Sequence, residues 1–354
     1  MALSYTGENI TGNVISLSDC ALFDFEVDGT NASQIIKGFW QLRIDGTPAG
    51  TKEYVPDGDY SVSFNQELSR ILETDYFSGL PYTHSAASAL FDVLYGTQTT
   101  TLDPCLTEET TGGNTADFYV VNAKTQIGDS FNWSNPVVLS RRPTSYSICA
   151  SQDDMMTIWG GNSGTSFEIT GRGPGQSTTI NVPALSVYTF PIPYISGGNV
   201  ITFTVNEVTY TISVQSDCCC SGEWAEVHFL ENLGGWSSYS FKCLGAAGAI
   251  RENTLACLTN SCASTGTQTA VYQSSSRPVI TLVAEIDVDE FSVAFWNEFF
   301  TSTKHYLKVI NSPFVSGDLF VPYTIENGDY QIYKEGETVV AEINMSPVSY
   351  DVLI

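Results

Sequence analysis

The stretch from Trp224 to Cys243 is the feature that most constrains the fold of this chain. It contains two runs in which apolar and polar residues alternate, and the segment Asn232-Leu-Gly-Gly235 lies between them. Alternation of this kind predicts β-strands, and a glycine pair supplies the positive φ angles that a tight return needs. We therefore predict a β-hairpin with Gly234 and Gly235 in its turn. Aromatic residues on both strands indicate that this hairpin belongs to the core of the second half of the chain.

Composition predicts a mainly β, multi-domain protein with few short helices. The 354 residues are more than one ordinary core accommodates, and the hydrophobic content of 42% is high enough for packed cores. Glycine is frequent, whereas lysine and arginine together number only 14. This balance favours short strands and many turns over long helices.

The net charge limits the partners of the chain. Thirty-nine acidic and 14 basic residues give a formal net charge of −25, which repels nucleic-acid phosphates and anionic membranes. The charge has two explanations: one is solubility or a salty environment, and the other is a wall past which DNA slides without binding. We expect no sequence-specific nucleic-acid binding, and no membrane insertion because no window approaches the ~18 apolar residues of a spanning helix.

The N-terminus and the cysteines together predict reduced thiols. The first residues show no basic start followed by an apolar run, so we expect synthesis in a host cytoplasm without a secretory signal. Nine cysteines are an odd number for a disulfide framework. The spacings at Cys218–Cys220 and between Cys257 and Cys262 differ from the paired knuckles of zinc sites. We expect neither a metal nor a cofactor, although zinc at this cysteine cluster stays an alternative.

Turn signals and periodicity divide the chain into three expected domains. Residues 1–143 are a β-rich domain with a short helix from Phe64 to about Thr74, with Asn65 as its N-cap, and a loop at 97–114. Residues 144–216 contain seven short apolar runs separated by glycine-rich turns, a pattern typical of an immunoglobulin-like β-sandwich. Residues 217–354 are an α+β domain with a hairpin, a polar segment at 245–269, a helix and a meander. Asp287 and Glu290 mark the expected start of that helix.

Several groups could carry chemistry, and each also has a structural explanation. The three histidines, His84, His228 and His305, fall in different segments without a catalytic spacing, so we expect no enzyme and no catalytic residue. The acidic pairs Asp153-Asp154 and Glu108-Glu109 are expected to be exposed and solvated, with calcium binding as the alternative. Four aromatic residues could stack on a sugar, although core packing explains them more simply. They are Trp40, Trp133, Trp159 and Tyr188.

The expected helix in the last domain suggests an interface between subunits. It has five aromatic residues within ten positions, which is more apolar surface than one small sheet covers. We predict that Trp296, Phe299 and Phe300 contact a neighbouring copy, and that Trp296→Glu would prevent assembly.

Four short motifs resemble virion tail and baseplate proteins of tailed bacteriophages that infect Bacteroidetes. The motifs lie at 63–72, 122–128, 232–241 and 295–310, in the same order as in that family. The resemblance implies a virion protein in the tail, baseplate or neck that forms a symmetric ring of its own copies and contacts neighbouring tail or neck proteins. It supplies no catalytic residues. A carbohydrate- or receptor-binding β-sandwich protein, such as a fibre or adhesin, and an acidic glycoside hydrolase remain the alternatives.

Overall fold

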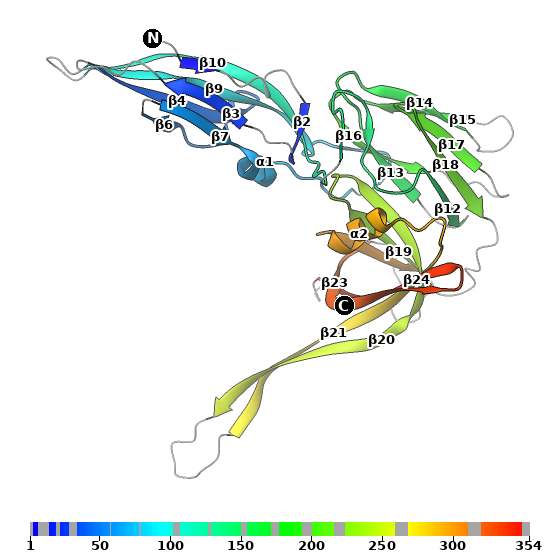
Figure 1. The fold of residues 1–354 in the computed structure, drawn as a ribbon. Coiled ribbons are helices and arrows are strands. Elements are labelled where there is room, and N and C mark those ends of the chain that lie inside the picture. The colour runs from blue at the N-terminus through cyan, green and yellow to red at the C-terminus, as the bar shows by residue number, and fades with distance from the viewer. Residues whose placement is uncertain are drawn as a thin grey trace, which may run out of the picture.

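The structure is a computed structural model of the whole chain. It describes residues 3–5, 14–18, 22–27, 34–56, 58–77, 79–101, 107–126, 129–149, 154–170, 177–192, 200–215, 224–258, 268–310 and 320–348. The mainly β, multi-domain fold that composition predicts is confirmed. The strands form several sheets, which group into three bodies named here the N-terminal body, the sandwich and the barrel (Figure 1). The helices of the described residues are the short α1 and α2.

The N-terminal body packs two sheets and α1 (Asn65–Ile71) around one core. The three-stranded sheet contains β1 (Leu3–Tyr5), β3 (Leu22–Val27) and β7 (Gly58–Ser63). The six-stranded sheet contains β2 (Val14–Ser16), β4 (Gln34–Ile44), β5 (Thr47–Pro48), β6 (Glu53–Val55), β9 (Ser88–Thr101) and β10 (Thr107–Val121). Phe64, Leu68 and Leu72 recur at the helical spacing and are buried, so α1 covers the core with this one face.

Two expectations for this body are wrong. The described residues of 97–114 are strand and not loop, because β9 and β10 continue as an antiparallel pair out to Thr101 and Thr107. Threonine is β-branched and fits a pleated sheet, so a threonine-rich run supports strands as readily as a polar loop. Asn65 does not cap α1. Phe64 holds the N-cap position without a side-chain hydrogen bond, and the Asn65 amide donates instead to the Leu17 carbonyl at 3.1 Å.

The sandwich confirms the seven predicted runs as strands. They are β12 (Ser145–Cys149), β13 (Asp154–Trp159), β14 (Thr165–Thr170), β15 (Ser177–Val182), β16 (Val187–Ile192), β17 (Val200–Val205) and β18 (Val208–Gln215). Two further strands, β8 (Tyr82–His84) and β11 (Val137–Val138), complete the sheet of order β11-β13-β16-β8. Since both precede residue 144, residues 144–216 do not make this sheet alone.

The last part of the chain forms a closed six-stranded barrel of order β19-β20-β21-β24-β23-β22. Its strands are β19 (Trp224–Leu230), β20 (Trp236–Leu258), β21 (Gln268–Asp287), β22 (His305–Ile310), β23 (Val321–Glu335) and β24 (Thr338–Pro347). The small and polar residues of 245–269 form strands wherever the structure describes them. Most of them continue β20, which pairs with β21 as a two-stranded extension beyond the barrel (Figure 1).

Helix α2 (Val293–Thr301) begins later than its acidic residues suggest. Ser292 is the N-cap, and its side chain accepts a hydrogen bond from the Phe295 N–H at 3.3 Å. Asp287 ends β21, and the Glu290 carboxylate instead accepts from the hydroxyl of Ser147 in the sandwich at 2.7 Å. Both acids are therefore unavailable as caps.

The aromatic face of α2 packs into the barrel core, which corrects the predicted interface. Phe299 lies 4.9 Å from Phe229 and 5.4 Å from Phe241, between ring centroids. Trp296 is 2% exposed and Phe299 is fully buried, while Phe300 is partly buried against the same core. Burial of each large side chain contributes roughly 1.5–3 kcal/mol to folding. Trp296→Glu would disrupt this core, so the substitution does not test a contact between copies.

The hairpin that we predicted is confirmed as β19 and β20, paired from Trp224 with Lys242 to Leu230 with Trp236. Gly234 has φ +82°, as a tight return requires. Both glycines also face backbone of the preceding bodies. A Cβ atom on Gly234 would lie 1.7 Å from the Asn122 carbonyl oxygen, and one on Gly235 would lie 2.1 Å from that of Leu139. The turn is therefore wedged against two other segments, which the local pattern did not predict.

Two glycines with positive φ allow the cost of backbone strain to be separated from the cost of the close contact with the Asn122 carbonyl. Gly336 also has a positive φ, +66°, but nothing lies within 4 Å of its added Cβ. We expect Gly336→Ala to lower the free energy of unfolding by about 1 kcal/mol, the cost of a left-handed alanine. Gly234→Ala should cost about 1–3 kcal/mol more, because the Asn122 carbonyl is backbone and cannot rotate away. Urea denaturation of both variants measures this difference, and equal losses would contradict the wedge.

Candidate functional site: the joint between the three bodies

The hairpin turn lies where the three bodies meet, a region named here the joint. The Lys124 N–H donates to the Asn232 carbonyl at 2.7 Å and ties the segment after β10 to the turn. Two small apolar cores lie around this contact and draw residues from all three bodies. The first contains Ala87, Val121, Ala123, Trp133, Val137, Leu139, Trp159, Val187 and Leu233, and the second contains Phe77, Met155 and Trp236.

A buried ion pair connects the sandwich to the barrel. The guanidinium of Arg142 donates to the Asp154 carboxylate and to the carbonyl of Ser238 in β20. Asp154 also accepts from the Tyr146 hydroxyl at 2.9 Å and from the Ser238 hydroxyl at 2.8 Å. Burial alone would lower the pKa of Arg142, but the charge of Asp154 raises it above the usual range. The expectation that Asp154 is exposed and solvated is wrong, since it is 4% exposed and fully bonded. Asp153 lies outside the described residues.

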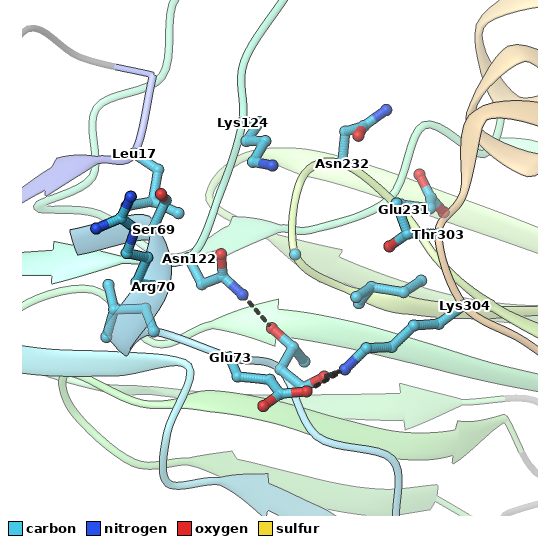
Figure 2. A pocket seen from close by; sticks show the side chains of 14 residues that line it. Leu17, Ser69, Arg70, Glu73, Asn122, Lys124, Glu231, Asn232, Thr303 and Lys304 are labelled. Carbon is cyan, nitrogen blue, oxygen red and sulfur yellow. Dashed lines mark hydrogen bonds and ion pairs between the residues drawn. The ribbon is translucent and has the colours of Figure 1, made fainter. Parts of the chain in front are cut away.

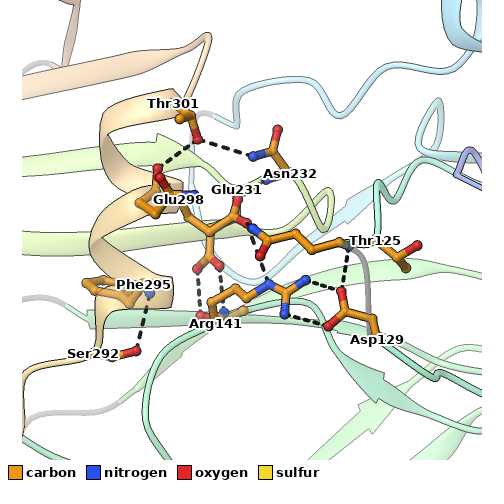
Figure 3. Close-up of polar contacts among 12 residues, drawn as sticks. Thr125, Asp129, Arg141, Glu231, Asn232, Ser292, Phe295, Glu298 and Thr301 are labelled. Carbon is orange, nitrogen blue, oxygen red and sulfur yellow. Dashed lines mark hydrogen bonds and ion pairs between the residues drawn. The ribbon is translucent and has the colours of Figure 1, made fainter.

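Glu231, at the end of the first hairpin strand, is a second buried carboxylate in the joint (Figure 3). It accepts from the Ser140 hydroxyl at 2.6 Å, from the Arg141 N–H at 2.6 Å and from the Ser237 hydroxyl. Burial raises the pKa of Glu231 to about 7, and the three donors only partly offset this effect. Glu231 therefore changes its protonation state near neutral pH.

Glu298 and Arg141 extend this network from α2 to the segment before the sandwich (Figure 3). Glu298 accepts from the Gln126 amide at 2.9 Å and from the Asn232 N–H at 2.6 Å, and it lies 3.5 Å from Arg141 Nε. The guanidinium of Arg141 also donates to both oxygens of Asp129. These hydrogen bonds lower the pKa of the Asp129 carboxyl. The contacts hold α2, the hairpin turn and the segment 126–141 together.

A third chain of hydrogen bonds runs from the N-terminal body through the sandwich. His84 Nδ1 lies 3.3 Å from Asp75 Oδ1, and His84 Nε2 lies 2.8 Å from Thr189 Oγ1. The order carboxylate, imidazole, hydroxyl is that of a hydrolase triad. Thr189 is fully buried and lies 2.7 Å from the Thr157 hydroxyl, so no substrate reaches it in this conformation. Burial lowers the pKa of His84, which favours the neutral imidazole. The arrangement connects three segments of the chain.

The other two histidines are also buried near the joint. His228 Nδ1 lies 3.0 Å from the Tyr76 hydroxyl, and its Nε2 lies 2.9 Å from Glu226. His305 Nε2 lies 2.8 Å from the Phe299 carbonyl, and burial lowers the pKa of His305 to about 4. The sequence placed the three histidines apart, and the fold does not bring them together in one site. Each histidine has its own hydrogen-bond partners in a different part of the fold.

A small pocket of about 290 Å³ opens beside the hairpin turn, between α1 and the segment 122–124 (Figure 2). Arg70, Lys124 and Lys304 line it. Lys304 is paired with Glu73, and the Asn122 amide donates to the Thr74 hydroxyl at 3.0 Å. Arg70 and Lys124 are exposed. The pocket marks the outer side of the joint, where the N-terminal body contacts the barrel.

The remaining candidates are distributed as follows. Among the described residues, no group of three or more His, Cys, Asp or Glu is placed to hold a metal ion. The side chains of the cysteines and of Glu108 and Glu109 lie outside what the structure describes, although both glutamates belong to β10. Trp133 and Trp159 are buried, and the Trp159 indole donates to the Trp133 carbonyl at 2.6 Å. Trp40 and Tyr188 pack against two other cores, so the core-packing prediction is confirmed and the four rings share no face.

No known protein-family model matches the chain, and no curated protein matches it. Within the described residues, neither helix has the length and apolar character needed to cross a membrane.

Breaking the buried ion pair of Arg142 and Asp154 should cost far more stability than breaking an exposed pair that also crosses the joint. Asp154→Asn leaves a buried guanidinium without its counter-charge, and we expect it to cost roughly 3–5 kcal/mol of unfolding free energy. Glu73→Gln removes the partner of Lys304 at the exposed rim and should cost less than about 1 kcal/mol. Chemical denaturation of the two variants compares them. Similar small losses of unfolding free energy in the two variants would show that the pair of Arg142 and Asp154 does not hold the sandwich to the barrel.

Glu231 should make stability depend on pH. Its pKa is about 7 in the folded chain against a usual value of 4.5, so the folded state binds this proton more tightly. The free energy of unfolding should therefore fall as pH rises from about 4.5 to 7 and then level off. His305 has the opposite effect, since its lowered pKa weakens the fold as pH falls from 6.5 towards 4.

Glu231→Gln isolates the contribution of Glu231 from that of His305. The variant should gain stability relative to the parent as pH rises from 5 to 8, as measured by denaturation at each pH. Glu73→Gln, at the exposed rim, serves as the control and should stay parallel to the parent. If the Glu231→Gln curve is also parallel, Glu231 does not titrate in this window.

Proposed function

We propose that this chain is a structural protein of a tailed-phage virion, part of the tail, baseplate or neck, in which its copies form a ring. The joint is the feature that supports this function most directly. Buried carboxylates and guanidinium groups with several specific partners each leave few alternative arrangements of the three bodies. A component that keeps its shape while neighbours pull on it needs such a rigid frame.

The motifs that carry the phage resemblance converge on the joint. Residues 122–128 and 232–241 touch directly, through the Lys124 N–H and the Asn232 carbonyl. Glu298, within 295–310, binds Gln126 and Asn232, one from each of these two motifs. Arg70 and Leu72, from 63–72, line the pocket beside them. Four segments that are distant in sequence therefore meet at the joint. This supports the proposal that the resemblance reflects a shared arrangement of these segments.

The alternatives have less support among the described residues. A sugar-binding face needs exposed aromatic rings side by side, whereas the exposed ones, Tyr54 and Tyr333, lie on different bodies. A glycoside hydrolase needs two carboxylates facing one cleft. The pocket beside the joint has Glu73 and Glu231, but Glu231 is buried and occupied by three donors.

Quantitative mass spectrometry of purified phage particles tests this function. Particles from the genome that encodes this chain should contain it at a fixed copy number, in proportion to a tail or neck protein. Images of the particles should show density for the three bodies repeated around the tail axis. If the chain stays in the lysate and is absent from particles, the structural role is wrong. Binding of the recombinant chain to a glycan array would then favour the receptor-binding alternative.

A further inference from the structure

The extension of β20 and β21 beyond the barrel, named here the arm, pairs with no other strand that the structure describes. β19 pairs with β20 only as far as Lys242, and β24 pairs with β21 only from Ile280. Beyond these points β20 and β21 pair with each other alone, from Gly248 with Val279 to Leu258 with Gln268. The arm projects away from the three bodies (Figure 1). Its tip lies outside the described residues.

A two-stranded ribbon is marginally stable in water, and its two outer edges present unpaired N–H and C=O groups. Soluble proteins usually protect such edges with charged side chains. Residues 245–278 contain only one of the 39 acidic residues, Glu252, and two of the 14 basic residues, Arg251 and Arg277. The net charge of this segment is therefore +1, which leaves −26 for the rest of the chain. The arm is attracted to the acidic body of another copy and is not repelled by it.

One strand edge on the barrel offers a complementary surface. β22 pairs with β23 only at Val321–Tyr323, and no described strand pairs with the outer edge of β23 from Gln331 to Glu335. Ile332 and Tyr333 on this edge are 41% and 44% exposed. Residues 326–337 contain four acidic residues and one lysine. The edge is therefore open, partly apolar and acidic.

We infer that the arm of one copy of this chain pairs, strand to strand, with the open edge of β23 in a second copy. The arm does not pair with β23 of its own chain, because β24 lies between β21 and β23 in the barrel. Donor and acceptor are different surfaces, so repeated contacts of this kind close into a ring or continue as a filament. Backbone pairing provides the affinity, as in other cases of strand addition. Only the place of this contact in a virion rests on the proposed function.

Two variants test the donor and the acceptor separately. In the first, an Asn-Gly turn joins Gly248 to Val279 and removes the arm, while the barrel pairings of β20 and β21 remain. In the second, Ile332→Glu and Tyr333→Asp place charges on the β23 edge. Val208→Glu in the sandwich is the matched control, since Val208 is 45% exposed on another body. Analytical ultracentrifugation over a range of concentrations should show oligomers for the parent and the control, and monomers for both variants.

Mixing the two variants gives the decisive result. The arm-deleted chain keeps an intact acceptor and the edge variant keeps an intact arm, so an equimolar mixture should form 1:1 dimers that grow no further. Melting temperatures close to that of the parent confirm that both variants are folded. A monomeric parent at every concentration, an arm-deleted chain that forms the parental oligomer, or folded variants that do not form the dimer would each overturn the inference.

This outcome is independent of the proposed function. If particles contain the chain and the arm-deleted chain still forms the parental oligomer, the inference fails and the virion role stands. If the oligomer depends on the arm but particles lack the chain, the virion role fails and the inference stands.

Discussion

The arrangement of the three bodies depends on the close approach of two backbone carbonyls to the glycines of the hairpin turn. The Asn122 and Leu139 carbonyls occupy the space that a side chain would need at Gly234 and Gly235. Because these contacts involve main-chain atoms, rotamer changes cannot relieve a clash, and any larger residue moves a whole segment. Trp236 follows the turn immediately, and its indole donates to the Asp75 carbonyl at 2.9 Å, so one hairpin contacts both preceding bodies. A turn that seems to serve only its own strands therefore orients the whole chain.

Local pattern predicts the strands of this protein well and their long-range pairing poorly. The seven sandwich strands and the hairpin follow from alternation and turn residues. Closure of the barrel does not, since β22 reaches β19 across seventy-five residues and residues 245–278 are rich in small residues typical of turns. The joint was missed for a similar reason. Asp154 follows another acidic residue and resembles a solvated charge, and only the fold shows that it meets Arg142. Ser292 was missed as a cap because nearby acids fitted the same rule.

Several of the few cations of this acidic chain form ion pairs with its own carboxylates. Three of the seven arginines, Arg43, Arg141 and Arg142, pair with Asp92, Asp129 and Asp154, of which Asp92 and Asp154 are buried. Each pair takes up one positive and one negative charge, so the net charge of −25 is unchanged and copies of the chain repel one another. Self-association then requires a surface with few acids, such as the arm.

The position of β8 has a consequence for synthesis on the ribosome. β8 pairs with β16, whose first residue, Val187, lies about a hundred residues after His84. At about 5–20 residues per second, the nascent chain carries this strand without its partner for about 5–20 s. During that interval the N-terminal body can form, but the segment from Asp75 to His84 has nothing to pack against. Slow codons within 85–187 would prolong this vulnerable period, whereas slow codons after residue 215 would give the sandwich time to form before the barrel emerges.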